Sequence, residues 1–127
     1  MNIIIIAIII LVVVIGISIY QTTFGFSAQL RKAEEYLAAD NLHGAVEIAH
    51  KLLERKNDYI PALYLKARIS IKQKQFLMAI SELNDIVAMP NHVTHIKGPE
   101  IHYHLAFLYN QTQNYLKEIE EYKNILV

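Results

Sequence analysis

The chain begins with a long run of apolar residues. Ile3 to Tyr20 reads IIIIAIIILVVVIGISIY, and 17 of the first 20 residues are hydrophobic. A helix over this run would be about 27 Å long, close to the ~30 Å hydrocarbon core of a bilayer. Tyr20, Phe24 and Phe26 suit the membrane interface, where aromatic residues collect. The pattern predicts a transmembrane helix, and we assign residues 1–26 to a membrane anchor with a short flank.

Two other interpretations of this segment were open. A cleaved signal peptide has a basic start, a shorter apolar core and a small-residue cleavage site. Here only Met1 and Asn2 precede the apolar run, and Gly16 to Ser18 is a weak cleavage candidate. A buried core helix would need partners around its whole circumference, and the rest of the chain is too short to supply them. We therefore favour a single-pass anchor.

The first basic residues set the expected orientation of this anchor. Residues 1–30 contain no charged side chain, and Arg31 and Lys32 follow the apolar run. Lys and Arg beside a transmembrane helix favour the cytoplasmic side. We expect the anchor in the inner (plasma) membrane, with the N-terminus outside and residues 27–127 in the cytoplasm.

Residues 27–127 contain a repeated helical pattern. Most sites of the first copy keep their size class 34 residues later, and again after a further 39 residues. Each copy holds two amphipathic stretches joined by a short polar turn, which favours antiparallel helical hairpins. The repeats span about 27–58, 59–92 and 98–127. The expected helices are 27–40, 42–56, 60–73, 75–89, 99–112 and 114–127.

This pattern resembles the tetratricopeptide repeat (TPR), a 34-residue helix–turn–helix unit. The clearest copies run from Ala67 to Ile80 and from Leu105 to Tyr115. The resemblance implies an all-α fold, in which the transmembrane helix precedes a right-handed α-solenoid of three TPR-like hairpins. The chain departs from the TPR pattern in two ways. Glu118 occupies a position that usually holds a small residue, and the hairpin turns lack their usual glycines.

A narrower resemblance concerns the order of the segments. An uncharged span, a short basic flank, two tandem repeats and a longer connector before the third are similar to the start of the lipopolysaccharide assembly protein B family. Those proteins are bacterial inner-membrane adaptors with more repeats and a Cys-based zinc module. This chain has no Cys, so we expect a truncated member or a shorter relative. The resemblance implies a scaffold in bacterial envelope assembly or its regulation.

The TPR resemblance also implies a groove on the concave face, lined by the first helix of each hairpin. Rings in that groove would hold apolar side chains of a protein or peptide partner, and Arg68 or Lys72 would pair with a carboxylate. The alternative for each residue is packing between hairpins. The first copy contributes Leu30, Glu34 and Leu37, and the groove candidates of the other two copies are Tyr64, Arg68, Ile71, Lys72, Tyr103, Phe107, Asn110 and Gln111.

Composition removes several other classes of function. With 12 basic and 12 acidic residues the net charge is zero, so nothing favours a nucleic-acid partner. The spacing of the clustered histidines fits no metal site, and we find no phosphate-binding loop or nucleophile motif. We therefore expect no cofactor, no metal and no enzymatic activity. The clustered histidines are His92, His95, His102 and His104, and a second cluster, of cations, comprises Lys66, Arg68, Lys72 and Lys74.

The sequence thus favours a membrane-anchored scaffold that binds the bilayer through residues 3–20 and a protein or peptide through its groove. The cation cluster would suit an acidic partner or anionic headgroups, or would simply be a solvated face. An alternative is an exported, envelope-side structural or assembly component. Another is self-association through residues 114–127, because Ile119, Tyr122 and Ile125 have no capping helix after them.

Overall fold

The structure is a computed structural model that describes residues 2–92, 96 and 98–126. Every element of this described part is an α-helix, so the all-α prediction is confirmed. Apart from the start of the first, the helices begin and end within two residues of the expected bounds. They are α1 (Asn2–Ala38), α2 (Leu42–Arg55), α3 (Ile60–Lys72), α4 (Phe76–Val87), α6 (Gly98–Gln111) and α7 (Tyr115–Leu126).

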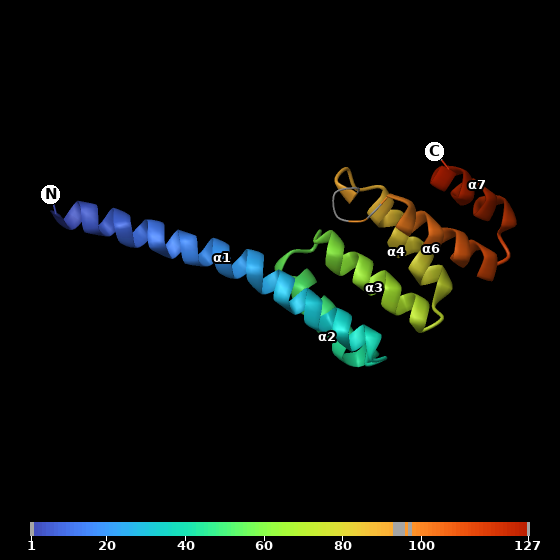
Figure 1. Ribbon diagram of the computed structural model, residues 1–127, viewed down its shortest axis with the longest axis horizontal. Coiled ribbons are helices and arrows are strands. Elements are labelled where there is room, and N and C mark those ends of the chain that lie inside the picture. Colours follow the sequence, from blue (N-terminus) through green and yellow to red (C-terminus); the bar gives the residue numbers. More distant parts are fainter. Residues whose placement is uncertain (1, 93–95, 97, 127) are drawn as a thin grey trace.

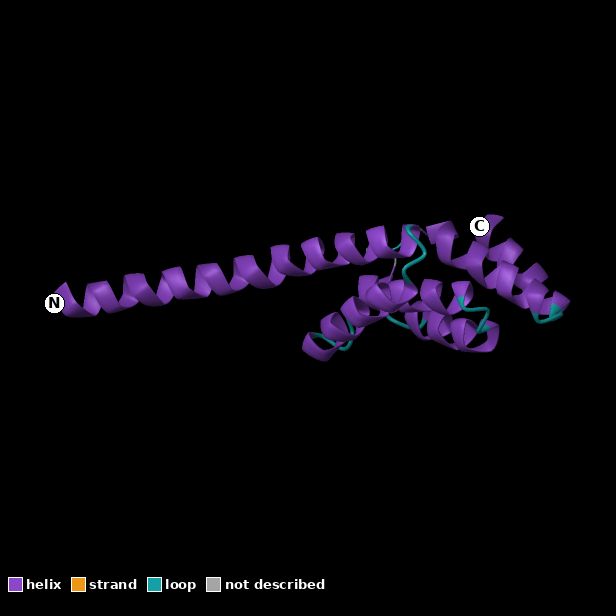
Figure 2. Cartoon of the chain, turned by 90° about the horizontal axis from the view of Figure 1, so that it is seen from below, coloured by secondary structure: helices purple, strands orange, loops and turns teal. Residues whose placement is uncertain are grey.

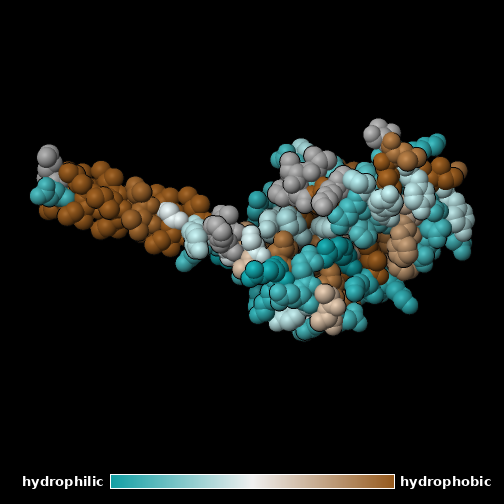
Figure 3. Space-filling view, in the orientation of Figure 1, coloured by the Kyte–Doolittle hydropathy of each residue, from teal (hydrophilic) through white to brown (hydrophobic). Residues whose placement is uncertain are grey.

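The first helix is longer than the sequence suggested. α1 runs without interruption from Asn2 to Ala38, through the region where we expected a flank between anchor and domain. Its N-terminal half projects away from the other helices (Figure 1) and is almost wholly apolar on its surface (Figure 3). Among the described residues, α1 alone is long and apolar enough to cross a membrane. None of its apolar stretch is buried by the domain, which excludes a core helix.

The C-terminal part of α1 begins a stack of three helical hairpins. It pairs with α2, α3 pairs with α4, and α6 pairs with α7 (Figure 1). Figure 2 shows the same stack from below, with short loops joining the helices. Small residues let these helices approach closely, and the alanines at the repeat positions are buried. Gly44 acts in the same way, because a Cβ there would lie 2.9 Å from Cδ2 of Tyr36. The buried alanines are Ala33, Ala45, Ala67, Ala79 and Ala106.

Two hydrophobic clusters hold the hairpins together. The first joins α1 and α2 to α3 through residues such as Leu37 and Leu65. The second joins α3, α4 and α6 around the fully buried Leu83. α7 contributes no buried residue and keeps an apolar face in solvent. That face, formed by Tyr115, Leu116, Ile119, Tyr122 and Leu126, includes positions that the sequence associated with self-association.

The three hairpin turns repeat the same backbone geometry without glycine. Asp40, Lys74 and Gln113 have φ angles of 60°, 59° and 60°. After each, the next N–H donates to a carbonyl five residues back, as from Gln75 to Ser70 at 2.9 Å. This is the Schellman motif, whose left-handed residue is most often glycine. The missing glycines therefore leave the turn geometry intact, but non-glycine residues adopt a left-handed conformation that costs energy.

We predict that Lys74→Gly raises the stability of the protein. Glycine adopts the left-handed conformation without the Cβ clash, and after its greater loss of backbone entropy the net gain is about 1 kcal/mol. Urea unfolding of the detergent-solubilised chain, followed by circular dichroism, measures the change. Gln73→Gly is the matched control, since Gln73 has a φ of −79° and should lose stability. A Lys74→Gly variant no more stable than wild type would contradict the prediction.

Candidate functional site

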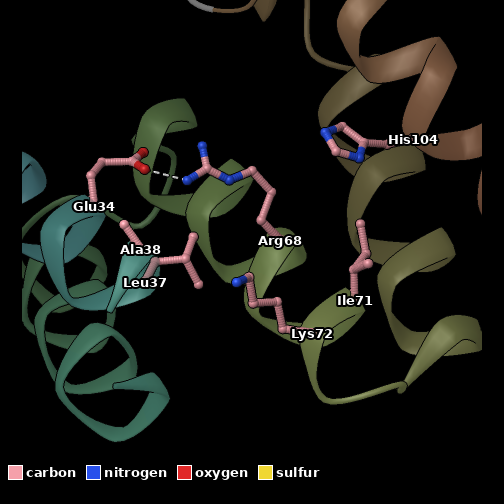
Figure 4. Close-up of a pocket in the computed structure, with 7 residues that line it drawn as sticks. All are labelled: Glu34, Leu37, Ala38, Arg68, Ile71, Lys72 and His104. Carbon is pink, nitrogen blue, oxygen red and sulfur yellow. Dashed lines mark hydrogen bonds and ion pairs between the residues drawn. The ribbon is translucent and has the colours of Figure 1, made fainter. Parts of the chain in front are cut away.

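A pocket opens where α1, α3 and α6 meet, and we call it the α1–α3–α6 pocket. Its volume is about 350 Å³. Leu37 from α1 and Ile71 from α3 are its apolar side chains, and the charged side chains of Arg68 and Lys72 lie between them (Figure 4). The lining residues are Glu34, Leu37, Ala38, Arg68, Ile71, Lys72 and His104.

The two cations of the pocket differ in their partners. Nη2 of Arg68 donates to Oε2 of Glu34, forming a partly exposed ion pair (Figure 4). These two residues are 34 positions apart, so the ion pair joins equivalent sites of successive repeats. Lys72 is exposed and forms no hydrogen bond or ion pair with the described residues. Lys72 is therefore the cation of this pocket that is open to a ligand, whereas a ligand carboxylate would compete with Glu34 for Arg68.

Tyr64 extends this polar network toward α6 from a buried position. Its hydroxyl donates to Oε1 of Glu100 at 2.9 Å, and the guanidinium of Arg68 lies 5.3 Å from its ring centre. The ring of His104 meets the Tyr64 ring edge-on, with 5.8 Å between centroids. Burial raises the pKa of Tyr64, and the hydrogen bond to Glu100 raises it further. Tyr64 thus connects α3 to α6 and is not among the residues that line the pocket.

We predict that His104 makes stability depend on pH. Burial lowers its pKa below 6.5, and nearby Arg68 also lowers it, while Glu100 opposes the shift. As the pH falls through 6.5 the unfolded chain binds the proton first, so stability declines until the folded-state pKa is passed. Urea midpoints between pH 7.5 and 5 should therefore fall less in His104→Asn than in wild type. His43→Asn, at an exposed site, is the control, and equal declines for both variants would contradict this role.

The remaining groove candidates lie outside the α1–α3–α6 pocket. Tyr103 and Phe107 are partly exposed on α6, and Phe107 meets Phe76 edge-on at 6.2 Å. The amide of Asn110 donates to Oε2 of Glu118 at 3.2 Å, which links α6 to α7.

Two further groove candidates also lie away from the pocket. Gln111 is exposed at the end of α6, and Leu30 packs against the first hydrophobic cluster. Of the eight groove candidates from the second and third copies, the structure therefore brings Arg68, Ile71 and Lys72 together. It adds Ala38 and His104, which the sequence analysis did not assign to a groove.

The class of ligand that fits the pocket follows from its lining residues. Comparisons with protein-family models, curated proteins and solved structures find no match. The lining combines apolar side chains, an internal ion pair and one open ammonium group. Such a surface can bind a segment that carries apolar side chains and an acidic group.

The four cations of the second hairpin do not form one surface patch. Lys66 lies 3.8 Å from Oε2 of Glu82, on the side of α3 that meets α4. Glu82 also accepts a hydrogen bond of 2.5 Å from the hydroxyl of Ser70. This bond accounts for a buried serine at a repeat position where the other copies have tyrosine. Lys66 thus contacts α4, Arg68 pairs with α1 and Lys72 borders the pocket. Lys74 is exposed in the turn between α3 and α4.

The clustered histidines are likewise spread over separate contacts. Nδ1 of His92 lies 2.8 Å from the carbonyl oxygen of Met89, and Nδ1 of His102 lies 2.7 Å from Oε2 of Glu121. His95 is outside the described residues. Within the described part of the chain, no three potential metal-ligating side chains gather in one place.

Proposed function

We propose that this protein is a single-pass membrane scaffold that binds a protein or peptide segment in the α1–α3–α6 pocket. Its hairpins would then form a right-handed TPR-like solenoid. The observation that supports this proposal is the double use of α1. The helix that is apolar enough to cross a membrane also contributes Glu34, Leu37 and Ala38 to the pocket.

The continuity of α1 would set the distance of the pocket from the bilayer. At 1.5 Å per residue, Glu34 and Ala38 lie roughly 21–27 Å beyond Tyr20 along the helix axis. α1, α3 and α6 lie side by side across the stack, so a segment crossing all three would run roughly parallel to the membrane surface. With α1 upright in the membrane, the binding surface would lie at about this height above the bilayer.

The size and chemistry of the pocket favour an extended segment as the ligand. A volume of about 350 Å³ accepts a few side chains and not a folded domain. Leu37 and Ile71 would contact the ligand's apolar side chains, and Lys72 would pair with one carboxylate. We place the domain in the cytoplasm, on the inner (plasma) membrane, where it would serve bacterial envelope assembly or its regulation.

Site-specific photocrosslinking in intact membranes tests the proposed binding. A photoreactive residue at Lys72 should capture protein adducts, because it borders the pocket. The same residue at Glu47, an exposed site on α2 that does not line the pocket, is the control. Ile71→Asp should reduce the adducts formed from position 72. Equal capture from positions 72 and 47, unaffected by Ile71→Asp, would contradict the proposal.

Topology separates this proposal from an exported assembly component. A reporter that is active only in the cytoplasm should be active when it is fused after Val127. Activity only of a reporter that works outside the cytoplasm would favour the exported component.

Self-association is a second candidate function, favoured by the exposed apolar face of α7. Mass photometry of the solubilised chain, with Leu116→Ser as the comparison, measures it directly.

A further inference from the structure

A cluster of two rings and two cations lies where the end of α2 meets α1, just beyond the apolar run. We call Phe26, Arg55, Lys56 and Tyr59 the ring–cation cluster. The rings of Phe26 and Tyr59 lie 5.3 Å apart. The guanidinium of Arg55 is 5.4 Å from the centre of the Phe26 ring, and the ammonium of Lys56 is 5.8 Å from that of Tyr59. Both cations are exposed, and the two rings are half-buried.

The fold places this cluster at the end of the domain nearest the apolar run. α2 returns along α1, so the turn between α2 and α3 lies on the side of the domain facing the projecting helix (Figure 1). Phe26 is six residues after Tyr20, or about 9 Å further along the helix. The polar layer of a bilayer extends roughly 5–8 Å beyond each face of the hydrocarbon core. If the apolar run crosses the membrane, Phe26 lies just beyond the headgroup layer, and the long exposed side chains of Arg55 and Lys56 lie within reach of the headgroups.

We propose that Arg55 and Lys56 bind anionic phospholipid headgroups and thereby hold the domain upright on the membrane. This inference rests on the anchor of the proposed function. Aromatic rings that support cations are typical of the membrane interface. Glu54 and Asp58 flank the two cations in sequence and offset part of their charge. Two cations near an anionic surface should shift the balance between headgroup-contacting and free orientations by roughly tenfold.

Headgroup quenching in reconstituted vesicles tests this contact with the full chain. The protein has no Cys, so Asn57→Cys introduces one labelling site in the turn beside the cluster. A fluorophore at position 57 should be quenched by lipids spin-labelled on the headgroup. Quenching should be stronger in vesicles with about one third phosphatidylglycerol than in pure phosphatidylcholine. A label at Gln73→Cys, at the opposite end of α3, should show little quenching in either.

Charge variants identify which cations respond to the anionic lipid. Arg55→Gln with Lys56→Gln should abolish the increase caused by phosphatidylglycerol. Lys72→Gln with Lys74→Gln removes the same charge from the far end of the domain and should leave the increase intact. Circular dichroism verifies that each variant is folded.

Four outcomes would overturn the inference. Quenching at position 57 could be the same with and without phosphatidylglycerol, or it could still increase with phosphatidylglycerol in the Arg55→Gln/Lys56→Gln variant. Either result would contradict the inference and leave the anchor in place. Loss of the increase in phosphate buffer, but not in chloride of equal ionic strength, would indicate a site for free anions instead. In a flotation gradient, a chain that does not rise with either kind of vesicle would contradict both the anchor and this inference.

Discussion

Replacing Leu83 with alanine is expected to lower the free energy of unfolding by about 2–5 kcal/mol. Leu83 is fully buried in the second hydrophobic cluster, which joins α3, α4 and α6. Removing three carbon atoms there leaves a cavity that surrounding helices fill only in part. A domain of this size has a total stability of about 5–15 kcal/mol, so the loss is a large fraction of it. In a stack of hairpins it also weakens the contact between neighbouring units.

Leu77→Ala provides the matched control for this experiment. Leu77 lies on the same helix, α4, but 75% of its surface is exposed. The substitution should therefore change stability by less than about 0.5 kcal/mol. Urea unfolding of the solubilised chain, followed by circular dichroism, measures both variants. Similar midpoints for Leu83→Ala and Leu77→Ala would show that α4 does not connect the second and third hairpins as the structure has it.

The hairpins could be predicted from the sequence because their packing is local. Ala33, Ala67 and Ala106 occupy the same position of three successive copies, and all three are buried. Partners within a hairpin are close in sequence, so the spacing of small and large apolar residues indicates both the helices and the turns between them. The turn residues themselves were less informative. Lys74 adopts a left-handed conformation that its chemistry does not favour.

The unbroken course of α1 could not be predicted from hydropathy. The apolar run ends at Tyr20, yet helical hydrogen bonding continues through Phe26 and on to Ala38. Hydrophobicity reports where a helix meets lipid, whereas its continuation depends on the backbone and on packing against α2. This continuity matters for the proposed function, because it makes the candidate anchor and one side of the pocket parts of a single helix.

The composition of the pocket depended on helix rotation, which the repeat pattern does not specify. The repeat spacing aligns Arg68 with Phe107, but it is His104, three residues earlier, that lines the pocket. Which residues of α6 face α3 follows from how α6 turns about its axis. The ion pair of Arg68 with Glu34 could have been anticipated, since opposite charges stand at equivalent sites of neighbouring repeats.

The double substitution Leu11→Arg/Val12→Arg is expected to remove the protein from the membrane fraction. Both residues lie at the middle of the apolar run and are exposed in the structure. An arginine at the centre of a transmembrane helix costs about 2.5–3.5 kcal/mol on insertion scales, so two cost about 5–7 kcal/mol. That approaches the total gain from inserting a run of this length. Resistance to alkaline carbonate extraction measures the effect, and Leu11→Ile/Val12→Leu is the control that keeps the run apolar.

Intact mass of the wild-type chain distinguishes an anchor from a cleaved signal peptide in the same samples. An anchor predicts that residues 1–20 are retained in the carbonate-resistant form, because they hold it in the bilayer. A mature chain lacking these residues would contradict the anchor, whatever the arginine variant does. The domain itself should fold alike in the wild type and in both variants, since the apolar stretch of α1 is not buried against the rest of the chain. Loss of membrane retention with unchanged urea unfolding of the hairpins would therefore assign the effect to insertion and not to misfolding.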